Sequence, residues 1–458
     1  MSTDLIEATI GDIEPGSWKN TILAGLANYI DAGSIVAGSA ALALWAQRYH
    51  LTTGFLGLIA AFSANAIAAG VGALIGGFLC DRLGRKKIYQ YDMLFYAFGM
   101  LWLVFTVQPW MIVLGSVLVG LAVGADIPAS WSLIAETAPE GKRGAHGGVA
   151  QVLWLLGPFV VLLMSFLLAP LGLLGARLVF AHLLLLALLL TLLRSRIRES
   201  PIWMAAKSME RPNVNASRYQ MNGHHQLLDT RYLRSMVFLI GMYGIFNLYT
   251  GTLGFFLPYI LRTVGTQSQV MAMGLQAGGA FLSIASLVLI FMRLVDRVNQ
   301  RLLLGFSIAL QIVALSLFAV LPLKAPVVIL FIVLSALSWF GAPQAFYQLW
   351  SAELFPTLVR GSAQGITFAA VRIALGLWSF FVPFLAATQF TTLVWILVAF
   401  LAVSGVIGVV WGPRNEGKSL VQIESEVSLT PTSNPMDRVS SSAPRGCDGT
   451  DSRDPEGA

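Results

Sequence analysis

Charged residues are scarce in this chain of 458 residues. Asp, Glu, Lys and Arg together supply 11% of the sequence, whereas ordinary soluble domains contain about 25%. Hydrophobic residues supply 56%. This composition argues against a soluble domain and indicates a chain that lies in a lipid bilayer. The net charge of +6 is interpreted below as a signal of membrane topology, so no nucleic-acid partner is expected.

Groups that support catalysis or metal binding are also sparse. The two cysteines, Cys80 and Cys447, fall in a helix end and in a polar tail, so we expect no structural disulfide. His182, His224 and His225 have no partner at metal-ligand spacing, so neither a metal nor another cofactor is expected. The chain has no Walker loop, which argues against ATP as the energy source. No Ser–His–Asp or Cys–His arrangement is visible, so an enzyme is not predicted.

Long apolar runs are abundant. A run of about 20 residues crosses about 30 Å of hydrocarbon, and about twelve such runs occur. Backbone amides in lipid need internal partners, so these runs are predicted to be helices. The predicted spans are 20–45, 53–80, 88–107, 110–136, 146–170, 173–194, 233–261, 267–293, 301–322, 325–352, 361–386 and 391–411. The expected fold class is an all-α membrane protein with twelve transmembrane helices.

A motif of the form Glu-x-x-Pro-x-x-x-Arg-Gly occurs at residues 136–144 and again at 353–361. The pair Asp81-Arg82 recurs as Asp296-Arg297 at nearly the same interval. A fixed interval across most of the chain indicates duplication. We therefore expect two pseudo-symmetric six-helix bundles, an arrangement typical of secondary transporters.

The basic residues predict the orientation. They gather after every second span, whereas the opposite loops hold scattered single charges, so both termini are expected on the cytoplasmic side of the cell (inner) membrane. The expected organisation is a cytoplasmic N-terminus at 1–19, bundles at 20–194 and 233–411, a cytoplasmic linker at 195–232, and a disordered tail at 412–458.

Four motifs resemble those of the major facilitator superfamily. Residues 76–87, Gly-Gly-Phe-Leu-Cys-Asp-Arg-Leu-Gly-Arg-Lys-Lys, are similar to that family's loop between helices 2 and 3. The duplicated Glu-x-x-Pro-x-x-x-Arg-Gly motif, residues 198–201 and residues 416–420 resemble the sugar and polyol porters. Within this branch, residues 28–33 and 124–128 look most like bacterial inositol-type transporters.

The resemblance implies a cytoplasmic gate. Ion pairs within and between the halves would hold that side shut and break as the halves rock. The alternative is that these charges only mark topology and cap helices. The residues assigned to the gate are Asp81, Arg82, Arg85, Glu136, Arg143, Glu353 and Arg360.

Asp31, Asp126 and Arg372 fall near the middle of their spans. Each costs about 2.5–3.5 kcal/mol on insertion, so each should face protein or a water-filled cavity. Asp31 matches the first-helix acid of the family's sugar–proton symporters, so Asp31 and Asp126 are predicted to couple transport to protons. A structural Asp satisfied by backbone is the alternative.

Arg372 and Asp126 depart from typical sugar porters, as does Ser116 where those porters carry an Arg. Three interpretations stay open. Arg372 pairs with Asp31 or Asp126 across the halves, or it binds a carboxylate or phosphate of the solute with its planar fork, or it forms a purely structural pair.

Amides within the spans favour a hydroxylated solute, because an amide donates and accepts at once. Gln151 aligns with a Gln that contacts sugar in the family. The hexose porters' helix-7 amide pattern is missing apart from Asn247, which favours another polyol such as inositol. The predicted solute-binding residues are Asn28, Gln151, Trp131, Asn247, Gln344, Gln348, Arg372 and Trp378.

The sequence thus predicts a transporter that works by alternating access, with symport of protons and a small polyol or sugar. Its partners are that solute, protons and the bilayer, and a monomer is expected. One alternative is a proton-coupled transporter of a small organic anion with Arg372 as the anion site. Another is a transporter-like sensor that binds solute without moving it.

Overall fold

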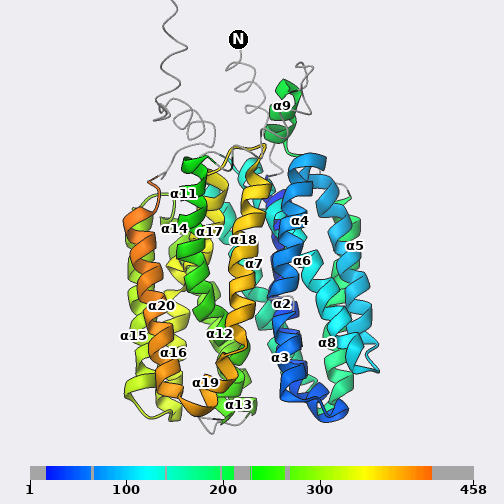
Figure 1. The fold of residues 1–458 in the computed structure, drawn as a ribbon, viewed down its shortest axis with the longest axis vertical. Helices are drawn as coiled ribbons and strands as arrows, with labels where there is room; N and C mark the ends of the chain where they lie inside the picture. Colours follow the sequence, from blue (N-terminus) through cyan, green and yellow to red (C-terminus); the bar gives the residue numbers. More distant parts are fainter. Residues whose placement is uncertain are drawn as a thin grey trace, which may run out of the picture. The chain divides into compact units, whose positions relative to one another are not determined.

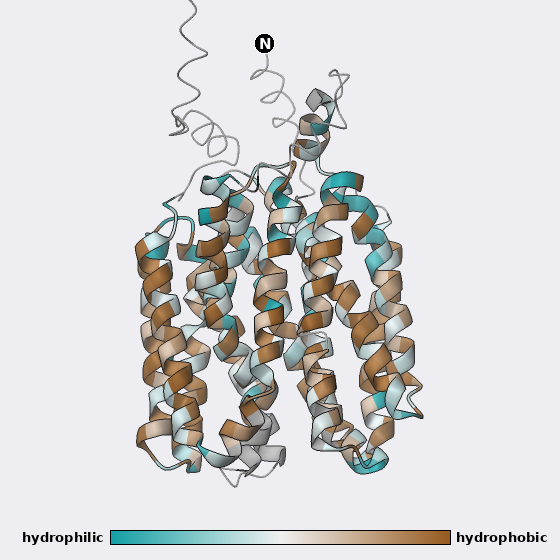
Figure 2. Cartoon of the chain, in the orientation of Figure 1, coloured by the Kyte–Doolittle hydropathy of each residue, from teal (hydrophilic) through white to brown (hydrophobic). Residues whose placement is uncertain are grey.

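The computed structural model describes residues 17–62, 66–139, 142–195, 199–210, 227, 229–263 and 269–414. Within these ranges the regular structure is helical and contains no β-strand. The helices run side by side (Figure 1), with apolar residues along their lengths and polar residues concentrated at their ends (Figure 2). The described residues fall in one compact unit. Most of the predicted N-terminal segment and nearly all of the predicted tail lie outside the described residues.

The first half follows the predicted order of six spans. They are α2 (Ser17–Tyr49), α3 (Thr53–Ala61) with α4 (Ile67–Leu83), α5 (Arg85–Val104), α6 (Pro109–Thr137), α7 (Arg143–Leu167) and, after the short η1 (Ala169–Leu171), α8 (Leu173–Arg194). One further helix, α9 (Pro201–Glu210), lies in the predicted linker and coincides with none of the predicted spans.

The second half repeats this order with more interruptions. Its elements are α11 (Thr230–Leu239), η2 (Ile240–Gly244), α12 (Ile245–Thr263), α13 (Gln269–Ser286), η3 (Leu287–Phe291), α14 (Met292–Leu294), α15 (Gln300–Val320), α16 (Ala325–Leu337), η4 (Ser338–Gly341), α17 (Pro343–Glu353), α18 (Arg360–Ser379), α19 (Val382–Thr388) and α20 (Phe390–Trp411).

Eight described segments are long and apolar enough to cross a bilayer: 109–137, 144–167, 173–194, 230–254, 274–294, 300–320, 325–353 and 390–411. The other four predicted spans coincide with α2, α3–α4, α5 and α18–α19. Each predicted span therefore corresponds to helix, and the predicted fold class is confirmed.

Several of the predicted spans are interrupted by turns of other helix types. η2 and η3 are single π-turns inside spans, and such turns are frequent at functional sites. η4 is a 3₁₀ turn that ends just before Pro343. Proline has no N–H to continue a helix, so α17 starts afresh there.

The halves meet where α4 packs against α18 and α7 packs against α13. Small residues permit the first of these contacts. A Cβ on Gly77 would meet the backbone oxygen of Gly361, and one on Gly365 would meet the oxygen of Ala73. The backbones of α4 and α18 therefore approach more closely than larger side chains would allow.

Candidate functional site

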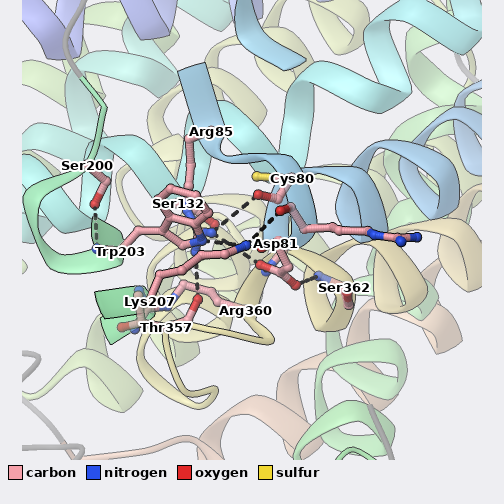
Figure 3. A network of polar contacts seen from close by, with 12 residues as sticks. Cys80, Asp81, Arg85, Ser132, Ser200, Trp203, Lys207, Thr357, Arg360 and Ser362 are labelled. Atoms are coloured by element: carbon pink, nitrogen blue, oxygen red, sulfur yellow. Dashed lines mark hydrogen bonds and ion pairs between the residues drawn. The ribbon is translucent and has the colours of Figure 1, made fainter. Parts of the chain in front are cut away.

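A buried ionic network joins the halves at the end of the bundle that carries Asp81, Arg85, Glu136 and Arg360, referred to below as the motif end (Figure 3). Glu136 on α6 accepts from Arg85 on α5 at 3.0 Å and from Arg360 on α18 at 2.7 Å. Arg85 also donates to the backbone oxygen of Thr357 at 2.6 Å. Two of these bonds connect residues of the first half to residues of the second.

Asp81 completes the network by accepting from backbone amides. Its carboxylate takes the N–H of Gly361 at 3.0 Å and that of Ser362 at 2.6 Å, at the start of α18. Its distance to Arg85 is 3.4 Å. The first turn of a helix has N–H groups without intrahelical partners and a partial positive charge, so a carboxylate there is stabilising.

The duplicated residue Asp296 makes the corresponding contact in the opposite direction. It accepts from the N–H of Gly144 at 3.0 Å and of Ala145 at 3.1 Å, at the start of α7. Each half therefore holds the first turn of a helix of the other half. The repeated Asp-Arg and Arg-Gly pairs are the sequence signal for these two contacts.

The segment after the sixth span supports the motif end. Glu199 accepts from the N–H of Arg85 and of Lys86, both at 3.1 Å, at the start of α5. Gly84, just before that helix, has φ +102°, and a Cβ there would collide with Glu199. Trp203 on α9 donates to the backbone oxygen of Asp81 at 3.3 Å.

The remaining residues predicted for the gate lie differently. Arg82 is exposed, and its backbone oxygen accepts from Lys207 at 2.7 Å. Glu353 is buried at the end of α17 and lines a small cavity of about 20 Å³ with Trp131 and Gln348. The side chain of Arg143 lies outside the described part of the chain.

Further polar and aromatic contacts join the two halves next to the ionic network. Gln151 on α7 donates to Gln348 on α17 at 2.7 Å, and Ser132 donates to Gln364 at 2.9 Å. Trp131 lies edge-on to two rings of the second half, those of Tyr347 and Phe368. The structure therefore shows the state in which the motif end is closed.

Beyond this closure lies a cavity of about 230 Å³, the central cavity. Its lining from α7 lies between Trp154 and Leu162, and its lining from α12 lies between Phe246 and Leu257. Three predicted solute-binding residues line it, namely Asn247, Gln344 and Arg372. Asn247 donates to Tyr243 at 3.2 Å, while its Oδ1 has no hydrogen-bond partner in the described part of the chain.

The other predicted solute-binding residues do not line the central cavity. Asn28 donates to the backbone oxygen of Ala150 at 3.3 Å. Gln151 and Gln348 bond to each other across the two halves. Trp378 donates to Thr252 at 2.8 Å. Their contact with solute remains a prediction for states in which the motif end is open.

The two predicted proton-coupling residues lie in different surroundings. The Oδ2 of Asp31 accepts from the indole N–H of Trp154 at 3.3 Å, and Arg372 interacts with its carboxylate electrostatically. Asp126 forms an ion pair with Arg194 at 2.9 Å. Arg372 itself lies over the ring of Phe368, at 4.6 Å from the ring centre.

The sequence did not identify Arg194 as a functional residue. It lies at the end of a span, where basic residues were interpreted only as a signal of membrane orientation. It is fully buried at the end of α8, contacts Asp92 at 3.4 Å, and lies 3.5 Å over the ring of Tyr89. The cluster holds two acids, Asp92 and Asp126, against one guanidinium. The need of Asp126 for a buried cation was the signal that could have found it.

The described residues contain no group of three or more His, Cys, Asp or Glu that could hold a metal ion. The geometry offers a solute-sized cavity that is lined by residues of both halves, and a buried ionic network closes the motif end.

A model of the family described as "Sugar (and other) transporter" matches residues 47–427. The chain belongs to this family. It is therefore a multi-pass membrane transporter and not an enzyme, and the predicted resemblance to sugar and polyol porters is confirmed.

Two curated relatives are similar over most of their length. The minor myo-inositol transporter IolF of Bacillus subtilis (strain 168) is 45% identical over 419 residues, which cover 91% of this chain and 95% of that protein. The glucose transporter GlcP of Staphylococcus epidermidis is 26% identical over 405 residues, covering 80% of this chain and 87% of that protein.

Among solved structures, the major facilitator superfamily proton:xylose symporter XylE bound to 6-bromo-6-deoxy-D-glucose superposes with a TM-score of 0.75. The two sequences are 18% identical, and the match covers 90% of this chain and 98% of that one. At this identity the likeness shows the fold, which is that of the major facilitator superfamily.

Proposed function

We propose that this protein is a proton-coupled symporter of a small, uncharged polyhydroxylated solute, with myo-inositol as the first candidate. The observation that carries the proposal is the central cavity, where the amides Asn247 and Gln344 face a solute-sized space. An amide can donate to one hydroxyl and accept from the next, which suits vicinal hydroxyls. The relative IolF, named as a myo-inositol transporter, supports the choice of solute.

The cavity between two halves, with one end closed by the ionic network, suits a mechanism of alternating access. With the motif end closed, solute enters the central cavity from the opposite side. Breaking the network of Glu136, Arg360 and Asp81 lets the halves rock and releases solute past Gln151 and Gln348. Asp31 carries the proton, since an ionisable group at this depth in a span is commonly functional.

The placement in the membrane is part of the proposal. The basic loops favour a cytoplasmic motif end and cytoplasmic termini, in the inner membrane of a bacterial cell. The two halves enclose the central cavity within one chain, so the working unit is a monomer.

A second candidate function is transport of a small organic anion. Arg372 lines the central cavity, and its planar guanidinium suits a carboxylate. Under this candidate, removing the negative charge of the solute abolishes binding.

The test is uptake of labelled myo-inositol into proteoliposomes under an inward proton gradient, with unlabelled competitors. The proposal expects accumulation that an uncoupler abolishes, and competition by uncharged polyols but not by small carboxylates. Competition by carboxylates that Arg372→Ala removes would favour the anion transporter instead. Binding of solute without accumulation would favour the sensor.

A further inference from the structure

Trp154 stands between the carboxylate of Asp31 and the central cavity. Asp31 does not line the cavity, whereas Trp154 does. The indole N–H of Trp154 donates to the Oδ2 of Asp31 at 3.3 Å. The Oδ1 of Asp31 has no hydrogen-bond partner in the described part of the chain. Any signal from this carboxylate to the solute space thus has Trp154 as a direct route.

The same indole also crosses to the second half. Its ring stacks on Trp339, with the ring centres 5.9 Å apart and the planes at 26°. Trp339 lies in η4, the 3₁₀ turn between α16 and α17, and lines the central cavity as well. One side chain therefore contacts the acid of the first half, the cavity, and a helix break of the second half.

Four titratable or charged groups surround Asp31 and interact with it electrostatically: Arg372 on α18, Asp126 on α6, Tyr96 on α5 and Tyr243 in η2. Arg372 lines the cavity too. A test of the role of Trp154 must therefore separate its N–H from these charge effects, which a change that keeps the ring can do.

We propose that Trp154 is the positioning residue that transmits the protonation state of Asp31 to the central cavity. This inference rests on the proposed proton symport. A carboxylate accepts a charge-assisted hydrogen bond about twice as strong as a neutral one. The ionised Asp31 holds the indole in its present orientation; the protonated acid releases it, and the ring shifts against Trp339 in the cavity wall. The solute is proposed to prefer the cavity with the Trp154 ring in its shifted position. By linkage, the solute then binds more tightly when Asp31 carries its proton.

The first experiment compares wild type with Trp154→Phe, which retains a ring against Trp339 and lacks the N–H. Binding of myo-inositol to the purified protein is measured from acidic to alkaline pH. In wild type the dissociation constant is expected to rise roughly tenfold on going to alkaline pH, the size of effect that one charge-assisted hydrogen bond can produce. In Trp154→Phe this ratio falls to about one. The matched control Trp110→Phe alters an exposed ring at the start of α6 and keeps the wild-type ratio.

A second experiment needs no solute. The tryptophan fluorescence of the solute-free protein is titrated with pH. A change in wild type and Trp110→Phe that is absent from both Trp154→Phe and Asp31→Asn supports the proposal. A change that persists in Trp154→Phe overturns it, as does an unaltered pH dependence of solute binding in that variant. Wild type that binds no myo-inositol while the fluorescence pattern holds would overturn the choice of solute and leave the Asp31–Trp154 link supported.

Discussion

The Nη1 of Arg360 lies 2.7 Å from the Oε1 of Glu136, and both side chains are fully buried although they belong to different halves of the chain. Arg85 and Asp81 complete a set of two cations and two anions. Removing one member of a buried ion pair costs about 3–5 kcal/mol, because its partner is left uncompensated. The closed state of the motif end therefore depends on this set.

We expect Glu136→Gln to open the motif end. The change leaves Arg85 and Arg360 without the carboxylate that both contact, which destabilises the closed state relative to the open one. Spin labels on the motif-end termini of α4 and α18 should then report a longer distance by electron paramagnetic resonance. Asp229→Asn is the matched control, because this exposed N-cap of α11 accepts from the N–H of Arg231 in its own first turn. Equal distances in Glu136→Gln and the control would show that the network does not hold the end shut.

Gly365→Val should also prevent closure, for a steric reason. A side chain at this position would collide with the backbone of Ala73 on α4, and overpacking of this kind costs about 1–3 kcal/mol. Transport should fall and the same label distance should lengthen. Gly274→Ala, whose Cβ would meet nothing within 4 Å, should behave as wild type. Wild-type transport by Gly365→Val would refute the close approach of α4 and α18.

Asn247→Ala should weaken solute binding without unfolding the protein. The amide lines the central cavity and has an acceptor oxygen available for a hydroxyl. A lost hydrogen bond of about 1–1.5 kcal/mol raises the apparent KM roughly five- to tenfold. Asn299→Ala, at the exposed N-cap of α15, should leave KM unchanged. An unchanged KM in Asn247→Ala would remove this residue from the solute site.

The buried cluster around Arg194 predicts an asymmetry between two substitutions. Arg194→Gln leaves both Asp92 and Asp126 without their cation and should lower the stability of the protein by about 3–5 kcal/mol. Asp92→Asn leaves one acid paired with one guanidinium and should be tolerated much better. Thermal unfolding of detergent-solubilised protein measures both. Equal losses would contradict the proposal that the cluster depends on one guanidinium shared by two acids.

Much of the fold could be predicted from the sequence because the bilayer imposes the length and apolarity of every span. The interruptions could not. The turn at η4 is followed by Pro343, but the π-turns at η2 and η3 contain no comparable sequence signal. The central cavity was therefore anticipated only as a set of amides without positions.

The gate was predictable in its members and less so in its contacts. Duplication identified Asp81, Glu136 and Arg360, since repeated charges at span ends are unusual. The chemistry of Asp81 was missed: its partners include the backbone amides of α18, and an N–H group has no signature in a sequence. Trp154 and Trp339 meet across the halves at a sequence separation that no local pattern connects.

The central claim is that the solute and a proton are transported together and that Asp31 carries the proton. The most direct measurement is the external pH of a weakly buffered suspension of proteoliposomes when myo-inositol is added. Symport predicts alkalinisation that begins with the solute, is abolished by an uncoupler, and is absent in Asp31→Asn while that variant still exchanges labelled for unlabelled solute. Uptake of myo-inositol by wild type with no change in pH would contradict the account.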